Sequence, residues 1–110
     1  MRKLLESAIE KAVAQHAKAK GVISRKLDGM GHRSWPDRMF LRHGRVIFIE
    51  FKRKGEVPTP LQQLCHKQLT AAGFQVYIVD DIRWGKAIVS EFAECPAKAA
   101  GAKLHSIALH

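Results

Sequence analysis

The segment PDRMFLRHGRVIFIEFK (residues 36–52) decides the expected fold, because it has two hydrophobic stretches on either side of a tight turn. Hydrophobic residues flank RHGR (42–45), where Gly44 is able to adopt the positive φ that a tight hairpin turn requires. We therefore predict two antiparallel strands here. Two acidic residues, Asp37 and Glu50, lie within this hydrophobic and basic segment, and their positions need an explanation.

The register of the hairpin brings the two acidic residues together. A two-residue turn pairs Arg42 with Arg45, and each further pair moves one residue outward on both strands, so Asp37 lies opposite Glu50. Their Cβ atoms are then roughly 4.5–5.5 Å apart on one face. Two like charges at that distance repel unless a cation lies between them, and a divalent metal would supply that charge. A loop of three or five residues would shift the register.

Lys52 adds a third charged group at the same strand end. It lies two residues beyond Glu50, so both side chains project from the same face of the strand. Carboxylates are hard oxygen ligands suited to Mg²⁺ or Mn²⁺, whose bound water can be deprotonated to attack a phosphodiester. Lys52 would orient that water or offset charge on the phosphate. The alternative is that Asp37 only begins a strand and that Glu50 and Lys52 lie on a solvated face.

Length and charge indicate one basic domain. The 110 residues are 46% hydrophobic, which is enough for one core and too few for two, so residues 1–110 are expected to form a single domain. We place its core at about 4–92 and a tail at 93–110. Lys and Arg number 19 against 10 Asp and Glu, a formal charge of +9. Such a surplus indicates a polyanionic partner or an acidic membrane surface, and nucleic acid is the leading candidate.

Neither a targeting segment nor a cysteine motif is evident. The N-terminal MRKLLESAIEKAV is interrupted by Glu6 and Glu10 and lacks the apolar centre of a signal peptide, and no stretch reaches transmembrane length. We therefore expect a cytoplasmic protein that does not enter a membrane. Cys65 and Cys95 form no CxxC pair, so both are expected to be ordinary small apolar residues.

Apolar periodicity and turn residues predict the remaining elements. They are a helix at 3–19, a strand at 21–27, a loop at 28–36, a helix at 59–73 and a strand at 74–80. Thr59 as N-cap, Pro60 at the first helical position and Gly73 as a stop define the second helix. The segment at 82–92 is ambiguous between strand and helix.

The hairpin residues carry a family resemblance. Pro36-Asp37, followed after twelve residues by Glu50-Phe51-Lys52, resembles the PD-(D/E)xK signature of the restriction-endonuclease-like nucleases. From Glu6 to about Asp81 the chain also resembles the virus-type replication-repair nuclease (VRR-NUC) domain family. One departure is Trp35, which replaces a glycine that the family commonly has close before Pro-Asp. The resemblance implies an α/β fold, a restriction-endonuclease-like αβββαβ core with a mixed β-sheet.

The resemblance implies that Asp37, Glu50 and Lys52 are catalytic. Its metal ligands would be both of these carboxylates, the backbone carbonyl of Phe51 and an acidic residue on the first helix. That helix offers Glu6 and Glu10. At about 100° per residue, Glu6 falls at the edge of the apolar stripe and the other acid turns towards solvent, so we favour Glu6. The alternative is that each is a surface acid balancing a nearby lysine.

Gln62 aligns with a glutamine that the family has after its Glu-x-Lys strand, where it helps to hold the site. Thr59-x-x-Gln62 also fits a capping box, so a purely structural role is the alternative.

Five further side chains are candidate DNA contacts, and each has a structural alternative. They are Trp35, Arg38, Arg53, Lys54 and His66. The three basic residues flank the acidic pair and would contact phosphates, or they only solubilise the surface. His66 lies one helical turn beyond Gln62, where relatives often have a histidine, and a helix-surface or core-edge position is its alternative. Trp35 would stack on an unpaired base or cap the core.

Together, the residues and the resemblance predict a divalent-metal-dependent, structure-specific DNA endonuclease that uses Mg²⁺, with Mn²⁺ as a substitute. Small free-standing family members are similar to Holliday-junction resolvases, which implies a homodimer acting on branched DNA in a bacterial or phage-infected cell. The dimer surface is expected in the first helix, residues 82–92 or the apolar parts of the tail. The alternatives are a non-catalytic basic nucleic-acid-binding module and a flap or restriction-type nuclease.

Overall fold

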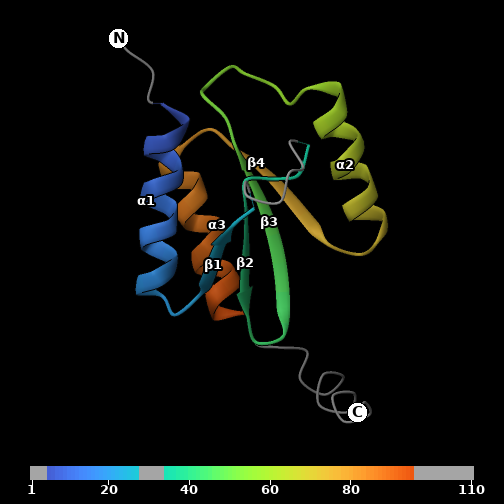
Figure 1. The fold of residues 1–110 in the computed structure, drawn as a ribbon. Coiled ribbons are helices and arrows are strands. Elements are labelled where there is room, and N and C mark those ends of the chain that lie inside the picture. The colour runs from blue at the N-terminus through green and yellow to red at the C-terminus, as the bar shows by residue number, and fades with distance from the viewer. Residues whose placement is uncertain (1–4, 28–33, 96–110) are drawn as a thin grey trace, which may run out of the picture.

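A computed structural model describes residues 5–27 and 34–95, which form a mixed four-stranded sheet with helices on both faces (Figure 1). The elements are α1 (Glu6–Ala19), β1 (Ile23–Lys26), β2 (Arg38–Arg42), β3 (Arg45–Phe51), α2 (Pro60–Ala71), β4 (Gln75–Val79) and α3 (Ile82–Glu94). The strand order is β1-β2-β3-β4, in which the first two pairings are antiparallel and β3 pairs with β4 in parallel. The predicted α/β class and mixed sheet are confirmed.

The hairpin of β2 and β3 has the predicted register. Its two central turn residues, 43–44, have φ values of 54° and 75°, as a type I′ turn requires. The ladder extends from this turn to the pair of Arg38 and Ile49. The next position outward brings Asp37 towards Glu50, because each step along a ladder advances both strands by one residue.

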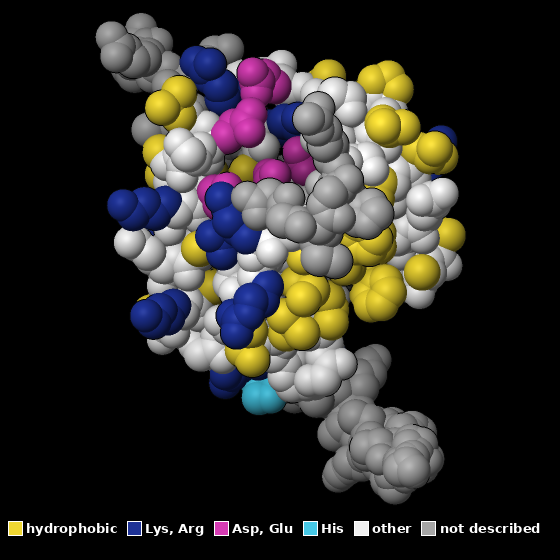
Figure 2. Space-filling view, viewed as in Figure 1, with side chains coloured by type: hydrophobic (Ala, Val, Ile, Leu, Met, Phe, Trp, Pro, Cys, Tyr) yellow, Lys and Arg dark blue, Asp and Glu magenta, His cyan; other side chains and the backbone are white. Residues whose placement is uncertain are grey.

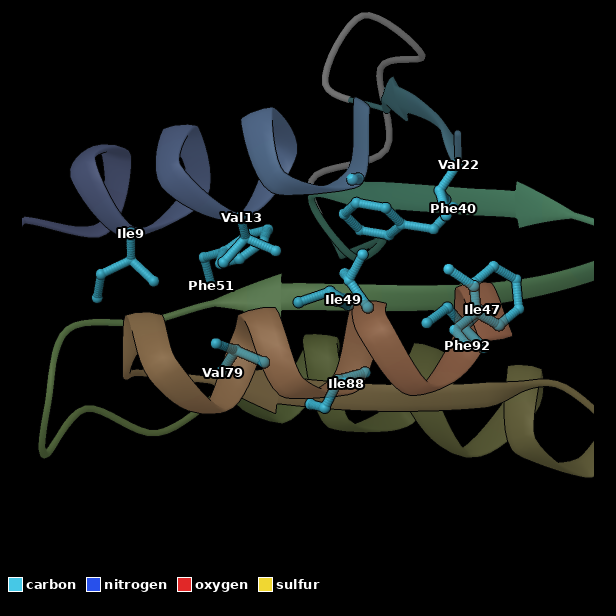
Figure 3. Close-up of a cluster of buried hydrophobic side chains, with 13 residues drawn as sticks. Ile9, Val13, Val22, Phe40, Ile47, Ile49, Phe51, Val79, Ile88 and Phe92 are labelled. Carbon is cyan, nitrogen blue, oxygen red and sulfur yellow. The ribbon is translucent and has the colours of Figure 1, made fainter. Parts of the chain in front are cut away.

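Opposite faces of β3 pack against different helices. Ile47, Ile49 and Phe51 face α1 and α3 and belong to the larger core, which Figure 3 shows. The other members of that core are Ile9, Val13, Ala17, Val22, Phe40, Val79, Ile88, Val89, Phe92 and Ala93. Phe48 faces the other way and packs in a smaller core with Leu27 and with the α2 side chains of Cys65 and Leu69.

Glu50 and Lys52 share the α2 side of the sheet with Phe48, because side chains alternate along a strand. Glu50 is only 2% exposed. The alternative interpretation that placed Glu50 on a solvated strand face is therefore wrong. Helices cover both faces of the sheet, so this end of β3 is buried although it carries the charged side chain of Glu50.

Residues 82–92, whose secondary structure was ambiguous in the sequence, lie within helix α3. Asp81 caps the helix by accepting a hydrogen bond from the Trp84 backbone N–H at 2.9 Å. Buried apolar side chains follow at helical spacing, and α3 packs along α1 (Figure 1). The helix extends to Glu94, so the first part of the expected tail is helical. The described residues do not include 1–4, 28–33 and 96–110, which belong to the expected first helix, loop and tail.

Both cysteines lie in the described part of the chain. Cys65 is buried, Cys95 is half-buried, and both are free thiols. None of the helices formed by residues 5–27 and 34–95 is long and apolar enough to cross a membrane.

Candidate active site

Asp37 is anchored at the open end of the hairpin by two backbone contacts. Its Oδ2 accepts a hydrogen bond from the Phe51 backbone N–H at 2.7 Å, and its carbonyl oxygen accepts one from the Leu27 N–H at 2.9 Å. Asp37 thereby connects the ends of β1, β2 and β3. Burial raises the pKa of Asp37, and the hydrogen bond from Phe51 opposes that increase.

Glu50 is the buried carboxylate of the site. Its Oε2 accepts a hydrogen bond from Gln62 Nε2 at 3.0 Å and lies 3.6 Å from Lys52 Nζ. Its Oε1 is buried and has no hydrogen-bond partner among the described residues. Burial and, second, the charge of Asp37 raise the pKa of Glu50 from 4.5 to about 7, although Lys52 acts in the opposite direction. Burial and the charge of Asp37 therefore disfavour the charged form of Glu50 more than Lys52 stabilises it.

Gln62 connects the first turn of α2 to this carboxylate. The Thr59 hydroxyl accepts a hydrogen bond from the Gln62 backbone N–H at 3.1 Å, and Gln62 Oε1 accepts one from the Thr59 N–H at 2.8 Å. These two bonds form a capping box. The amide nitrogen of the same side chain donates to Glu50. Gln62 thus makes both the structural contact and the site contact that the sequence left as alternatives.

The two acids of α1 have different surroundings. Glu10 Oε2 lies 2.7 Å from Arg38 Nε and 3.7 Å from Lys26 Nζ, so it is part of an ion-pair network that connects α1 with β1 and β2. Arg38 also donates from Nη1 to the Ser24 hydroxyl at 2.8 Å. The Arg38 side chain, expected to contact phosphate, is therefore engaged in contacts within the protein.

Glu6 instead faces the site. Its pKa is raised first by burial and then by a hydrogen bond with the Glu56 carboxyl, whereas the charge of Lys52 lowers it and that of Asp37 raises it. A hydrogen bond between two carboxyl groups requires a proton on one of them. The favoured acid of the first helix is thus electrostatically coupled to the acidic pair.

Glu56 was not identified from the sequence. Its Oε1 accepts a hydrogen bond from the Arg53 N–H at 3.1 Å, and its own N–H donates to the Arg53 carbonyl at 2.9 Å, which closes a turn through Gly55. This turn directs the Glu56 carboxyl towards Glu6. The glycine in RKGEVP signals the turn, but no sequence pattern signals a contact with Glu6 on the distant helix α1.

The other expected DNA contacts have varied positions. Lys54 is exposed and lies 3.8 Å from Asp80. Trp35 is 38% exposed and packs its ring edge-on against Phe48, with 6.0 Å between ring centroids. It therefore caps the smaller core while part of its ring faces solvent.

His66 is buried in α2, one turn beyond Gln62. Burial and, second, the charge of Lys52 lower its pKa. Its Nε2 atom is buried and has no hydrogen-bond partner in the described part of the chain. Arg53, at the start of the following loop, is half-buried.

The donor atoms fit a hard divalent cation. Asp37 and Glu50 supply carboxylate oxygens, and each has one oxygen held by a donor from the protein. Among residues 5–27 and 34–95, no group of three or more His, Cys, Asp and Glu side chains is arranged to hold a metal. Two carboxylates are nevertheless sufficient for Mg²⁺, which commonly binds proteins through one or two carboxylates and takes its other ligands from water and phosphate.

Acidic side chains gather at one end of the face shown in Figure 2, with Lys and Arg side chains beside and below them. A hairpin that ends in two carboxylates and a lysine, on a mixed sheet covered by helices, defines the chain as a nuclease fold of the PD-(D/E)xK class.

Comparisons with known proteins identify the family. The chain is 41% identical over 81 residues to "Putative nuclease p44" of Acyrthosiphon pisum secondary endosymbiont phage 1, a match covering 73% of this chain and 87% of the phage protein. A solved structure described as a VRR_NUC domain matches with a TM-score of 0.70 and 25% identity, covering 79% of this chain and 96% of that one. No protein-family model matches. The chain belongs to the VRR-NUC family of nucleases.

Proposed function

We propose that this nuclease is a divalent-metal-dependent endonuclease that hydrolyses phosphodiester bonds in branched DNA, with four-way junctions as its preferred substrate. The observation that carries the proposal is Glu50 Oε1, a buried carboxylate oxygen without a hydrogen-bond partner in the described structure, beside Asp37. Buried polar atoms are nearly always hydrogen-bonded or ligated, so a cation is the simplest partner for this atom.

The side chains divide the work in this proposal. Asp37 and Glu50 would bind Mg²⁺ or Mn²⁺ together with the Phe51 carbonyl oxygen. Glu6 does not form a three-ligand group with them in the described structure, so it would have to approach the ion to join them. The bound ion would supply an acidified water and neutralise charge on the phosphate. Gln62 and the Phe51 N–H hold one oxygen of each central carboxylate in place.

Lys52 has two roles in the proposed reaction. Its ammonium group lies 3.6 Å from Glu50 and its side chain is 12% exposed, so its charge is poorly screened by solvent. It would attract the phosphate and donate a hydrogen bond to the attacking water or to a phosphate oxygen. Removing it should therefore reduce cleavage more than binding.

The test is cleavage of matched four-way-junction, flap, single-stranded and duplex substrates with Mg²⁺, Mn²⁺ or EDTA. The junction should be cut fastest with either metal, and EDTA should stop cleavage. DNA binding without cleavage of any substrate would instead indicate a non-catalytic nucleic-acid-binding module.

Replacing Asp37 with Asn tests the site itself. Asp37→Asn should reduce cleavage to the level of the EDTA control, while binding in EDTA persists because phosphate contacts remain. Asp80→Asn, which removes an acid paired with Lys54, is the matched control and should cleave normally. Normal cleavage by Asp37→Asn would show that the site assignment is wrong.

A further inference from the structure

A basic groove lies between α1 and β1, beside the acidic end of the sheet. Lys11, Ala14 and Lys18 of α1 line one wall, and Lys26 and Arg38 line the other. The α1 residues are three or four positions apart, so they share one face of the helix. The groove has a volume of about 330 Å³. The small side chain of Ala14 leaves space between Lys11 and Lys18, where an extended DNA backbone would fit.

A second hollow continues this groove along β1. It has a volume of about 420 Å³, shares Ala14, Lys18 and Arg38 with the first, and adds Ser24 and Arg25. Arg25 is exposed, and its Nη1 donates to the Ser24 carbonyl oxygen at 2.9 Å. Because they share these lining residues, the two hollows adjoin, and we call them together the α1–β1 groove.

The charges of the α1–β1 groove are mainly positive. Glu10 is its acidic lining residue, and it is paired with Arg38 and Lys26 of the opposite wall. Lys11 and Lys18 are exposed along the wall. Figure 2 shows Lys and Arg side chains along this side of the molecule, on the same face as the acidic group.

The spacing of the wall lysines suits a nucleic-acid backbone. Lys11 and Lys18 are seven residues apart in α1, which corresponds to two turns and about 10 Å along the helix. One DNA strand advances about 3.4 Å per phosphate along the duplex axis, so this length spans about three phosphates.

The α1–β1 groove leads to the acidic pair. Its lining residue Arg38 directly follows Asp37 in the chain, and the charge of Glu10 contributes to the raised pKa of Asp37. A phosphate backbone lying in the groove would therefore pass close to Asp37.

We propose that the α1–β1 groove binds the phosphate backbone of the DNA and leads the strand to Asp37 and Glu50. Lys11, Lys18 and Arg25 are its phosphate contacts, and the Glu10–Arg38 ion pair connects the two sides of the groove. The proposal rests on the proposed nuclease function and specifies the surface that holds the substrate. Contacts with phosphates do not distinguish one base sequence from another. This property suits a nuclease that recognises the structure of DNA.

The test compares two double variants with the same change of charge. Lys11→Gln/Lys18→Gln removes the wall lysines, and Lys67→Gln/Lys86→Gln removes two exposed helix lysines from α2 and α3. Affinity for duplex and junction DNA is measured by fluorescence anisotropy in EDTA over a range of salt concentrations. Binding is thus measured without cleavage, so failure of the proposed nuclease activity would leave this test intact.

The groove variant should bind duplex DNA about tenfold or more weakly at about 0.1 M salt, with a salt slope reduced by about 2, because each lost phosphate contact changes the slope by about 0.9. The control variant should keep the parent's slope, and Lys11→Arg/Lys18→Arg should restore it. Unchanged binding by the groove variant, or an equal loss in the control, would show that the groove does not hold the DNA.

Discussion

Gln62 determines how Glu50 presents its carboxylate. Because Gln62 Oε1 accepts the Thr59 N–H at 2.8 Å, the amide nitrogen is directed to Glu50 Oε2 at 3.0 Å. This leaves Oε1 as the oxygen of Glu50 without a donor among the described residues. A local helix-capping contact therefore determines which carboxylate oxygen of the candidate site is left without a donor.

Removing the Thr59 hydroxyl should affect both stability and cleavage. Thr59→Ala should lower the free energy of unfolding by about 1 kcal/mol, as loss of an N-cap does, and should slow cleavage several-fold because Gln62 is less firmly held. Thr59→Ser keeps the hydroxyl and should retain both properties. Denaturant unfolding and cleavage kinetics measure the two effects. Loss of stability with unchanged cleavage would show that the capping box is only structural.

Glu50 should make the metal-free protein less stable as the pH rises. Its folded-state pKa of about 7 lies above the ordinary value of 4.5, so the folded chain binds this proton more tightly than the unfolded chain does. The contribution to stability is therefore present below pH 4.5 and is lost as the pH rises to 7. A shift of this size corresponds to about 3 kcal/mol.

Glu50→Gln replaces the carboxyl group with an uncharged amide, so the stability of this variant should not fall in this way as the pH rises. In EDTA its free energy of unfolding should exceed the parent's above pH 7, and the difference should shrink as the pH falls towards 4.5. Thermal unfolding over this pH range measures the difference. Glu91→Gln, on the exposed face of α3, controls for loss of one acidic charge. A parent protein as stable as Glu50→Gln at high pH would contradict the raised pKa.

At the scale of elements, the close contact of α1 with α3 depends on Gly85. A Cβ atom at this position would lie 2.6 Å from Val13 Cγ2 and 3.0 Å from Val79 Cγ1. Only glycine allows α3 to approach α1 and β4 this closely. Since α1 also carries Glu6, this packing influences the distance between the helix acid and the acidic pair.

Gly85→Ala should therefore destabilise the fold. Overpacking costs about 1–3 kcal/mol and should exceed the gain of about 1 kcal/mol that alanine brings in a helix. Denaturant unfolding measures the change. A Gly85→Ala variant that is more stable than the parent would show that α1 and α3 can separate without loss of stability.

An element can be predicted from the sequence when residues close to it in the chain determine its structure. The hairpin register follows from two turn residues, and the start of α2 follows from Thr59 and Pro60, so both were predicted correctly. The α3 segment was ambiguous because Ile88 and Val89 favour strands, whereas packing against α1 makes the segment helical. The Glu6–Glu56 contact joins distant segments through one loop conformation, which no local pattern encodes.

At the scale of the whole molecule, the α1–β1 groove limits where a partner subunit can bind. The first helix, residues 82–92 and the tail were the expected dimer surfaces. One side of α1 packs on α3 and another lines the groove, so DNA and a partner would compete for α1. The outer face of α3, where Trp84 is 46% exposed, remains accessible when the groove is occupied. The expected tail beyond Cys95 lies outside the described residues.

The branched-DNA proposal requires two active sites, because symmetric cutting of a four-way junction involves two strands related by a two-fold axis. One chain supplies one acidic pair, so a C2 homodimer is the simplest arrangement. Light scattering should give twice the chain mass of 12.3 kDa, and a junction should be cut faster than linear duplex of equal length. Two chains each carrying a charge of +9 would also make junction binding steeply salt-dependent. If the protein is a monomer and nicks linear duplex as fast as a junction, it does not act as a junction resolvase. The conclusion that it is a nuclease would still hold.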